Sequence, residues 1–175
     1  MTCPSKMSKV IFLDVDGVLC INGTIYGSLV KNLKKIVEKT GANIVLSSNW
    51  RLYPSYYKRI VDVLEKYGMR ISGHTGNIND ERPTEIFNWI LKNKPAMCVI
   101  LDDRNLEREK NGHKIKEAFI RTKYSTGLTT EYVQKAAFML NRCCLSHDIH
   151  VLRVVSSSRT EKLSYQQIHQ KHKVK

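Results

Sequence analysis

"KVIFLDVDGVLC", residues 9–20, joins an apolar run to two acids, Asp14 and Asp16, and then to Gly17. The apolar run reads as a buried strand, where an unpaired charge is strongly unfavourable. Residues i and i+2 of a strand share a face, so both carboxyl groups can point into one crevice. Gly17 permits the sharp backbone turn that must follow. The stretch therefore predicts a buried strand that delivers two acids to a functional site.

The rest of the chain alternates short β-branched runs with longer stretches of helical periodicity. Further strands are expected in "ANIVLSS" and "MCVILDD", with a shorter one in "EAFIRT", and helices over residues 28–39, 55–68, 84–93 and 131–143. Thr129 or Thr130 is expected to cap the last helix. This alternation is typical of βαβ units, and continuous apolar runs are typical of parallel strands buried on both faces. The sequence predicts an α/β fold with a central parallel sheet.

Composition predicts one domain in a reducing compartment. The 175 residues, 42% of them hydrophobic, suffice for one core, expected over residues 1–150. A basic, mobile segment is expected over residues 151–175. The odd number of cysteines, without metal-ligand spacing, favours neither disulfides nor zinc. We expect a cytoplasmic protein with no signal peptide or membrane span, and the net charge of +13 favours anionic partners.

Polar pairs follow all three long apolar runs, namely Asp14 and Asp16, Ser47 and Ser48, and Asp102 and Asp103. In open α/β sheets, ligands bind outside the carboxyl ends of the strands, so these groups should meet at one edge. Four carboxylates gathered there would repel one another unless a cation held them. Mg²⁺ is the natural cation, because it prefers oxygen ligands and leaves positions for water and a phosphate.

Each of these signals has a structural interpretation as well. A lone DxDG is also typical of a turn or of part of a calcium loop, two serines of a helix cap, and two aspartates of a solvated turn. The glycine comes too early for a calcium loop, and an apolar strand precedes it. Because all three polar pairs occur directly after predicted strands, a shared functional site is favoured over three separate structural roles. His74 and His113 have no partner at a diagnostic spacing and are expected to be surface histidines.

These motifs resemble those of the haloacid dehalogenase-like (HAD) phosphohydrolases. "DVDGVL", "LSSNWR", the basic residue in "ERPTEIFNWI" and "VILDD" are similar to motifs one to four, over residues 9 to about 140. The finer match, including "GLT" before the last helix, resembles the small HAD domains of Swiss Army Knife RNA repair proteins. The resemblance implies a Rossmann-like three-layer sandwich, an aspartyl-phosphate intermediate and dependence on Mg²⁺.

The resemblance also implies a role for each motif residue. Asp14 would be the nucleophile, and Asp16 would protonate the leaving oxygen and then activate water. Mg²⁺ would be held by Asp14, the Asp16 carbonyl and Asp103, with Asp102 beside it or bound through water. The phosphate-binding residues would be Ser47, Ser48, Asn49 and Arg82.

Two of these assignments stay open. The motif-three base is usually lysine, so here Arg82 must serve unless Lys92 does. Asn49, Trp50 and Arg51 follow the serines and are placed to line the entrance, although Trp50 is equally well explained by core packing.

Many HAD phosphohydrolases carry a cap domain that encloses small metabolites, inserted soon after motif one or between motifs two and three. This sequence leaves no room for a sizeable cap at either place. Only a short flap separates Gly17 from the helix near Ser28, and one helix, one short strand and a loop separate Arg51 from Arg82. An uncapped site suits a phosphate carried on a large molecule, which can itself cover the opening. We therefore expect a phosphomonoester hydrolase acting on a phosphorylated macromolecule.

Phosphotyrosine in a phosphoprotein is the favoured substrate at this stage, because several aromatic residues are placed to contact an aryl group, namely Tyr26, Trp50, Tyr53, Tyr56 and Tyr57. The alternatives are a phosphatase of nucleic-acid ends in RNA or DNA repair, and a non-catalytic module that binds nucleic acid or protein. The complete set of acids favours an enzyme, and the sequence shows no RRM or KH signature that would favour the binding module.

Overall fold

A computed structural model describes residues 9–142 of the chain. The segment 151–175, expected from the sequence to be basic and mobile, lies outside the described residues, as does the end of the expected domain at residue 150.

The centre of the fold is a five-stranded parallel sheet with the order β5-β4-β1-β6-β7. Its strands are β1 (Lys9–Leu13), β4 (Asn43–Leu46), β5 (Ile71–His74), β6 (Met97–Asp102) and β7 (Phe119–Arg121). The apolar run that begins the quoted stretch therefore forms the middle strand, and the other two long apolar runs form the strands on either side of it. The predicted α/β fold is confirmed, including the short strand in "EAFIRT".

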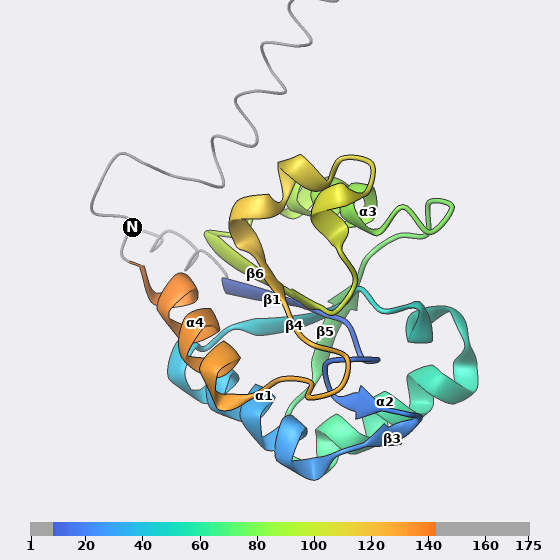
Figure 1. The fold of residues 1–175 in the computed structure, drawn as a ribbon, viewed down its shortest axis with the longest axis vertical. Helices are drawn as coiled ribbons and strands as arrows, with labels where there is room; N and C mark the ends of the chain where they lie inside the picture. The colour runs from blue at the N-terminus through green and yellow to red at the C-terminus, as the bar shows by residue number, and fades with distance from the viewer. Residues whose placement is uncertain (1–8, 143–175) are drawn as a thin grey trace, which may run out of the picture. The chain divides into compact units, whose positions relative to one another are not determined.

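Helices cover both faces of this sheet (Figure 1). The helices are α1 (Gly27–Thr40), α2 (Pro54–Lys66), α3 (Arg82–Asn93) and α4 (Thr130–Asn141). Helices α1, α2 and α4 contribute to the core cluster on one face, whereas α3 lies on the other, where the rings of Phe12 and Trp89 meet edge to face at 5.2 Å. The predicted three-layer sandwich is confirmed. Thr129 is the residue that precedes α4, although its side chain makes no capping hydrogen bond.

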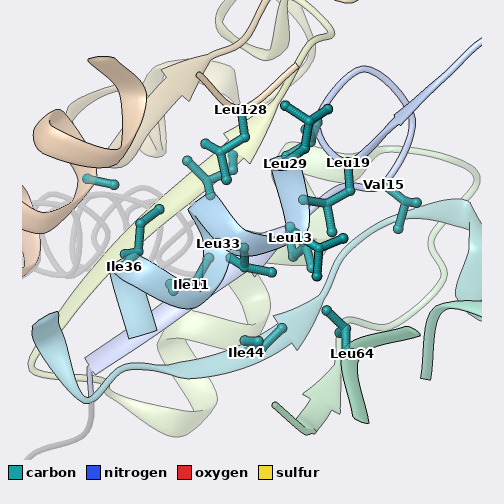
Figure 2. Packing of buried hydrophobic residues seen from close by; sticks show 14 of the residues in the cluster. Ile11, Leu13, Val15, Leu19, Leu29, Leu33, Ile36, Ile44, Leu64 and Leu128 are labelled. Carbon is teal, nitrogen blue, oxygen red and sulfur yellow. The ribbon is translucent and has the colours of Figure 1, made fainter. Parts of the chain in front are cut away.

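The alternation of side chains along β1 explains how one strand serves both layers. Ile11 and Leu13 point into the cluster that contains Leu33 and Ile36 of α1 (Figure 2). Phe12, between them, faces α3. Each fully buried aliphatic side chain contributes about 1.5–3 kcal/mol to folding. Replacing one of these side chains with a polar residue would lower the stability of the fold. The acids accordingly begin only after the strand ends, at Asp14.

Short elements occupy the places where a cap domain would be inserted. Strands β2 (Cys20–Ile21) and β3 (Thr24–Ile25) form an antiparallel hairpin whose two turn residues, Asn22 and Gly23, have positive φ. We call residues 20–25 the flap. Four 3-10 turns complete the described chain, at Asn49–Leu52, Leu106–Arg108, Gly112–Lys114 and Lys116–Ala118. The expected absence of a sizeable cap is confirmed within residues 9–142. Among the helices of these residues, none has the length and hydropathy that a membrane span requires.

Candidate active site

Three carboxylates meet at the carboxyl ends of β1 and β6. These strands are neighbours in register, with Leu13 opposite Leu101, so Asp14 and Asp102 come side by side. Asp103 follows directly, and one oxygen from each of the three carboxylates lies within 4.8 Å of the others. The parallel pairing of two strands thus joins acids that are far apart in the sequence.

Burial and mutual repulsion make this cluster unfavourable without a cation. Asp14 is 4% exposed, and burial, with the charge of Asp102 nearby, raises its pKa to about 6. Burial also raises the pKa of Asp102, and burial together with the Asp14 charge raises that of Asp103. Hard oxygen donors crowded in this way match the ligand preference of Mg²⁺. The residues present therefore fit the metal that the sequence led us to expect.

Arg82, the first residue of α3, is the cation that faces these acids. Its Nη1 lies 3.1 Å from Asp14 Oδ1 and 2.6 Å from Asp102 Oδ2. The two acids raise the pKa of Arg82 although its burial acts in the opposite direction. Lys92 lies in the last turn of the same helix and lines a surface groove that also contains His74 and Trp89. The structure thus brings Arg82 to the acids and leaves Lys92 at the other end of the helix.

Asp16 lies beside the cluster and is exposed to solvent. The indole Nε1 of Trp50 donates a hydrogen bond of 2.7 Å to Asp16 Oδ2. Burial, followed by the charge of the nearby Asp16 carboxylate, raises the pKa of the Cys20 thiol to about 11. The Asp16 side chain is not among the three that could share a metal ion. Ligation through the Asp16 carbonyl stays a prediction.

The residues after β4 bring hydroxyl and amide groups to the same place. Ser48 lies beside Asp14, where it acts to lower the pKa of that carboxyl group, and its oxygen accepts a bond of 3.4 Å from the Trp50 backbone N–H. Ser47 Oγ is buried and has no partner within the described part of the chain, and the same is true of Arg82 Nε. Asn49 Oδ1 accepts from Arg82 Nη2 at 3.3 Å. Buried polar atoms without partners are unfavourable, so Ser47 Oγ and Arg82 Nε are available to bind a ligand.

Arg51 does not line the entrance, contrary to the expectation from its place after the serines. Its side chain is 2% exposed and forms an ion pair of 2.6 Å with Glu85, which is also buried. The same guanidinium donates to the carbonyls of Ser47 and Ser48, at 2.8 Å each. Glu85 in turn accepts from the backbone N–H of Ile78 at 2.7 Å. The Arg51–Glu85 pair therefore ties the serine loop to α3 and to the loop before it.

Glu85 is the functional-site neighbour that sequence reasoning missed. It is separated from Arg51 by one helix, one strand and a loop, and although it lies within the quoted stretch "ERPTEIFNWI", the motif assigns a role only to the basic residue of that stretch. An acid within the first turn of a helix is ordinarily explained by the helix dipole. No local signal distinguishes it from such a residue.

Gly17 is required for two reasons at the exit from β1. Its φ is +67°, a conformation that residues with a Cβ adopt rarely, and a Cβ there would collide with the Asp103 side chain. Its carbonyl accepts a bond of 2.7 Å from Thr122 Oγ1 at the end of β7. The glycine thus allows the flap to start directly against the acidic cluster.

The aromatic residues near the site divide into two groups. Trp50 is 6% exposed and belongs to the core cluster, so its expected role in core packing is confirmed, and Tyr57 also packs against that cluster. A role for Trp50 at the entrance stays a prediction. Tyr26, Tyr53 and Tyr56 are each more than two-fifths exposed. The rings of Trp50 and Tyr56 lie 5.0 Å apart, and those of Tyr56 and Tyr53 6.1 Å apart, so a row of rings runs outward from Trp50. His74 and His113 are exposed, as expected.

Comparison with known proteins gives one match. Residues 10–133 match the family described as "HAD domain in Swiss Army Knife RNA repair proteins". This range includes every residue of the cluster, Arg82 and the Arg51–Glu85 pair. Comparisons with the curated proteins and with the solved structures found no match.

Proposed function

The chain belongs to the HAD domain family of Swiss Army Knife RNA repair proteins, a hydrolase-type domain, and on this premise we propose that it hydrolyses phosphomonoesters with Mg²⁺. The observation that carries the proposal is the junction of Asp14, Asp102 and Asp103 with Arg82 at one sheet edge. A carboxylate next to a guanidinium and a cation site is the arrangement that phosphoryl transfer needs. A purely structural site would be more stable without three crowded acids.

In the first step, Asp14 is the nucleophile. Its carboxylate oxygen attacks phosphorus, a P–O bond to Asp14 forms, and the bond to the leaving oxygen breaks. Asp16 gives its proton to that oxygen. Ser47 and Arg82 hold the non-bridging phosphoryl oxygens, with Ser48 and Asn49 beside them. The unpartnered Ser47 Oγ and Arg82 Nε support this assignment.

In the second step, Asp16 takes a proton from water, whose oxygen attacks phosphorus and releases Asp14 and inorganic phosphate. Asp14, Asp103 and the Asp16 carbonyl, with Asp102 beside them, would hold Mg²⁺, whose positive charge would offset the charge on the phosphoryl group. Asp102 already accepts bonds from Arg82 and from the Arg104 backbone N–H, which favours Asp103 as the direct ligand.

The substrate we propose is the terminal phosphate of a nucleic acid. The family is named for RNA repair proteins, the net charge of +13 favours a polyanion, and the described chain has no cap that would enclose a metabolite. Phosphotyrosine is the second candidate, because the exposed rings of Tyr53 and Tyr56 lie next to Trp50 and suit an aryl group. If no phosphatase activity is found, the remaining interpretation is a non-catalytic domain that binds nucleic acid or protein.

Hydrolysis of p-nitrophenyl phosphate tests the activity. We expect turnover with Mg²⁺, none in excess chelator, and none for Asp14→Asn with Mg²⁺. Asp62→Asn, which removes an acid from the exposed face of α2, should retain the wild-type rate. Equal rates for wild type and Asp14→Asn would remove the mechanism, and inactivity of wild type on every phosphate ester would favour the binding module.

A substrate panel tests the second half of the proposal. It compares oligonucleotides with 3' or 5' phosphate, phosphotyrosine and phosphoserine peptides, and sugar phosphates. The oligonucleotides should show the largest kcat/KM, because binding outside the phosphate pocket contributes to the transition state. A preference for a sugar phosphate over every macromolecule would contradict the argument from the missing cap.

A further inference from the structure

The hydrogen bond from Trp50 to Asp16 has a direction that matters for the chemistry. Indole Nε1–H is a donor only, so Asp16 Oδ2, at 2.7 Å, must accept from it. The carbonyl-type oxygen of a carboxyl group is a better acceptor than its hydroxyl oxygen, so this bond favours Oδ1 as the oxygen that carries a proton. The Cys20 thiol also lies near Asp16, and because a thiol both donates and accepts weakly, it is compatible with a charged or a neutral carboxyl group there.

Trp50 is itself held on several sides. Its ring packs at 5.0 Å against Tyr56, and the Arg59 guanidinium lies 5.4 Å from its centre. Arg59 also donates a bond of 2.9 Å to the Gly23 carbonyl in the flap. The indole is therefore held by two residues of α2, one of which is itself bonded to the flap, and this packing keeps its N–H directed at Asp16.

We propose that Trp50 is a positioning residue, whose indole N–H orients the Asp16 carboxyl group so that Oδ1 presents its proton to the leaving oxygen. The inference rests on the proposed function, in which Asp16 is the general acid. Proton donation matters most when the leaving group is a strong base. Loss of the indole N–H should therefore penalise poor leaving groups more than good ones.

The experiment compares kcat/KM for phenyl phosphate and p-nitrophenyl phosphate, which differ mainly in the basicity of the phenolate that leaves. For Trp50→Phe, which keeps an aromatic ring and removes the N–H, kcat/KM for phenyl phosphate should fall about tenfold more than for p-nitrophenyl phosphate. This is a fraction of the roughly 10²–10⁴-fold that general acid catalysis contributes. Trp89→Phe is the matched control, because it makes the same change on α3 and should alter neither value.

A second substitution covers the case in which Trp50→Phe fails to fold. The chain has two tryptophans, so in the Trp89→Phe background the isosteric benzothienyl analogue of tryptophan enters position 50 alone. It replaces N–H with sulfur and preserves the shape of the ring, so the same selective loss is expected without loss of packing.

Asp16→Asn distinguishes failure of the general-acid role of Asp16 from failure of the positioning role of Trp50. A larger fall than for Trp50→Phe, again selective for phenyl phosphate, supports Asp16 as the general acid. If Asp16→Asn is selective but both Trp50 substitutions lower the two substrates equally, Trp50 serves packing alone and the inference is overturned. If Asp16→Asn itself lacks this selectivity, the assigned role of Asp16 fails instead.

Discussion

Asp14 lowers the stability of the metal-free protein. Burial and the neighbouring Asp102 raise its pKa to about 6, against 3.8 for an exposed aspartate. The folded state therefore binds this proton more tightly than the unfolded state, and stability falls as the pH rises from about 3.8 to about 6. Above that range the loss amounts to about 3 kcal/mol. On the proposed function, this loss of stability is the cost of keeping a reactive carboxylate at the site.

Asp14→Asn should therefore abolish turnover and stabilise the metal-free fold. At pH 7 in chelator, we expect the free energy of unfolding in urea to rise by about 1–3 kcal/mol. Near pH 4 the wild-type carboxyl is largely protonated, so the difference should shrink. A less stable variant at pH 7 would show that Asp14 serves the fold rather than the chemistry.

The serine loop and α3 depend on one buried ion pair between them. The side chains of Arg51 and Glu85 are each at most 2% exposed. Together they bond to five backbone groups of the site loops, the carbonyls of Ser47, Ser48, Thr75 and Gly76 and the N–H of Ile78. Removing one partner of such a pair leaves the other charge buried and uncompensated. The position of Arg82 at the start of α3 should therefore depend on Glu85.

Glu85→Gln should lower the free energy of unfolding by about 3–5 kcal/mol and reduce kcat for p-nitrophenyl phosphate even under conditions where the variant is folded. Urea unfolding and kinetics at low temperature measure the two effects. Glu81→Gln is the control: it removes a carboxylate paired with an exposed lysine, Lys110, near the start of the same helix. It should change little, and an equal loss for both variants would refute the bracing role.

The elements themselves were largely predictable, because their signals are local. Buried parallel strands read as apolar runs, and the helices show apolar residues at helical spacing, as with Leu33 and Ile36 in α1. The meeting of the polar residues at the ends of β1, β4 and β6 was also predictable, because the carboxyl ends of neighbouring parallel strands lie at one edge of the sheet. The Arg51–Glu85 pair and the Trp50–Asp16 bond were not predictable, since each joins residues 34 positions apart through side-chain geometry that no spacing encodes.

The open architecture of the whole domain leaves substrate recognition to its surface. No insertion within residues 9–142 covers the site, and the row of rings from Trp50 to Tyr53 runs outward from it. Aromatic rings stack on nucleotide bases with little regard to sequence. The rings and the positive net charge together suit a single-stranded nucleic-acid end.

Tyr53→Ala should lower kcat/KM for a phosphorylated oligonucleotide about fivefold or more while leaving p-nitrophenyl phosphate unaffected, because a stacked base is worth about 1–3 kcal/mol. Phe138→Ala, which removes an exposed ring from α4, is the control. The wild-type rate on the oligonucleotide should also fall steeply with added salt. No effect of Tyr53→Ala, with salt-independent rates, would exclude nucleic acid as the substrate.

Trapping the covalent intermediate tests the mechanism most directly. In Asp16→Asn, p-nitrophenolate can still leave without a proton donor, but water is no longer activated, so phosphoryl groups should accumulate on the enzyme. The variant is mixed with Mg²⁺ and p-nitrophenyl phosphate, quenched in acid, treated with borohydride to reduce the acyl phosphate, and digested for mass spectrometry. We expect to find Asp14 reduced to homoserine. Modification of another residue, or an unmodified Asp14 while p-nitrophenol is released in a burst, would contradict the mechanism.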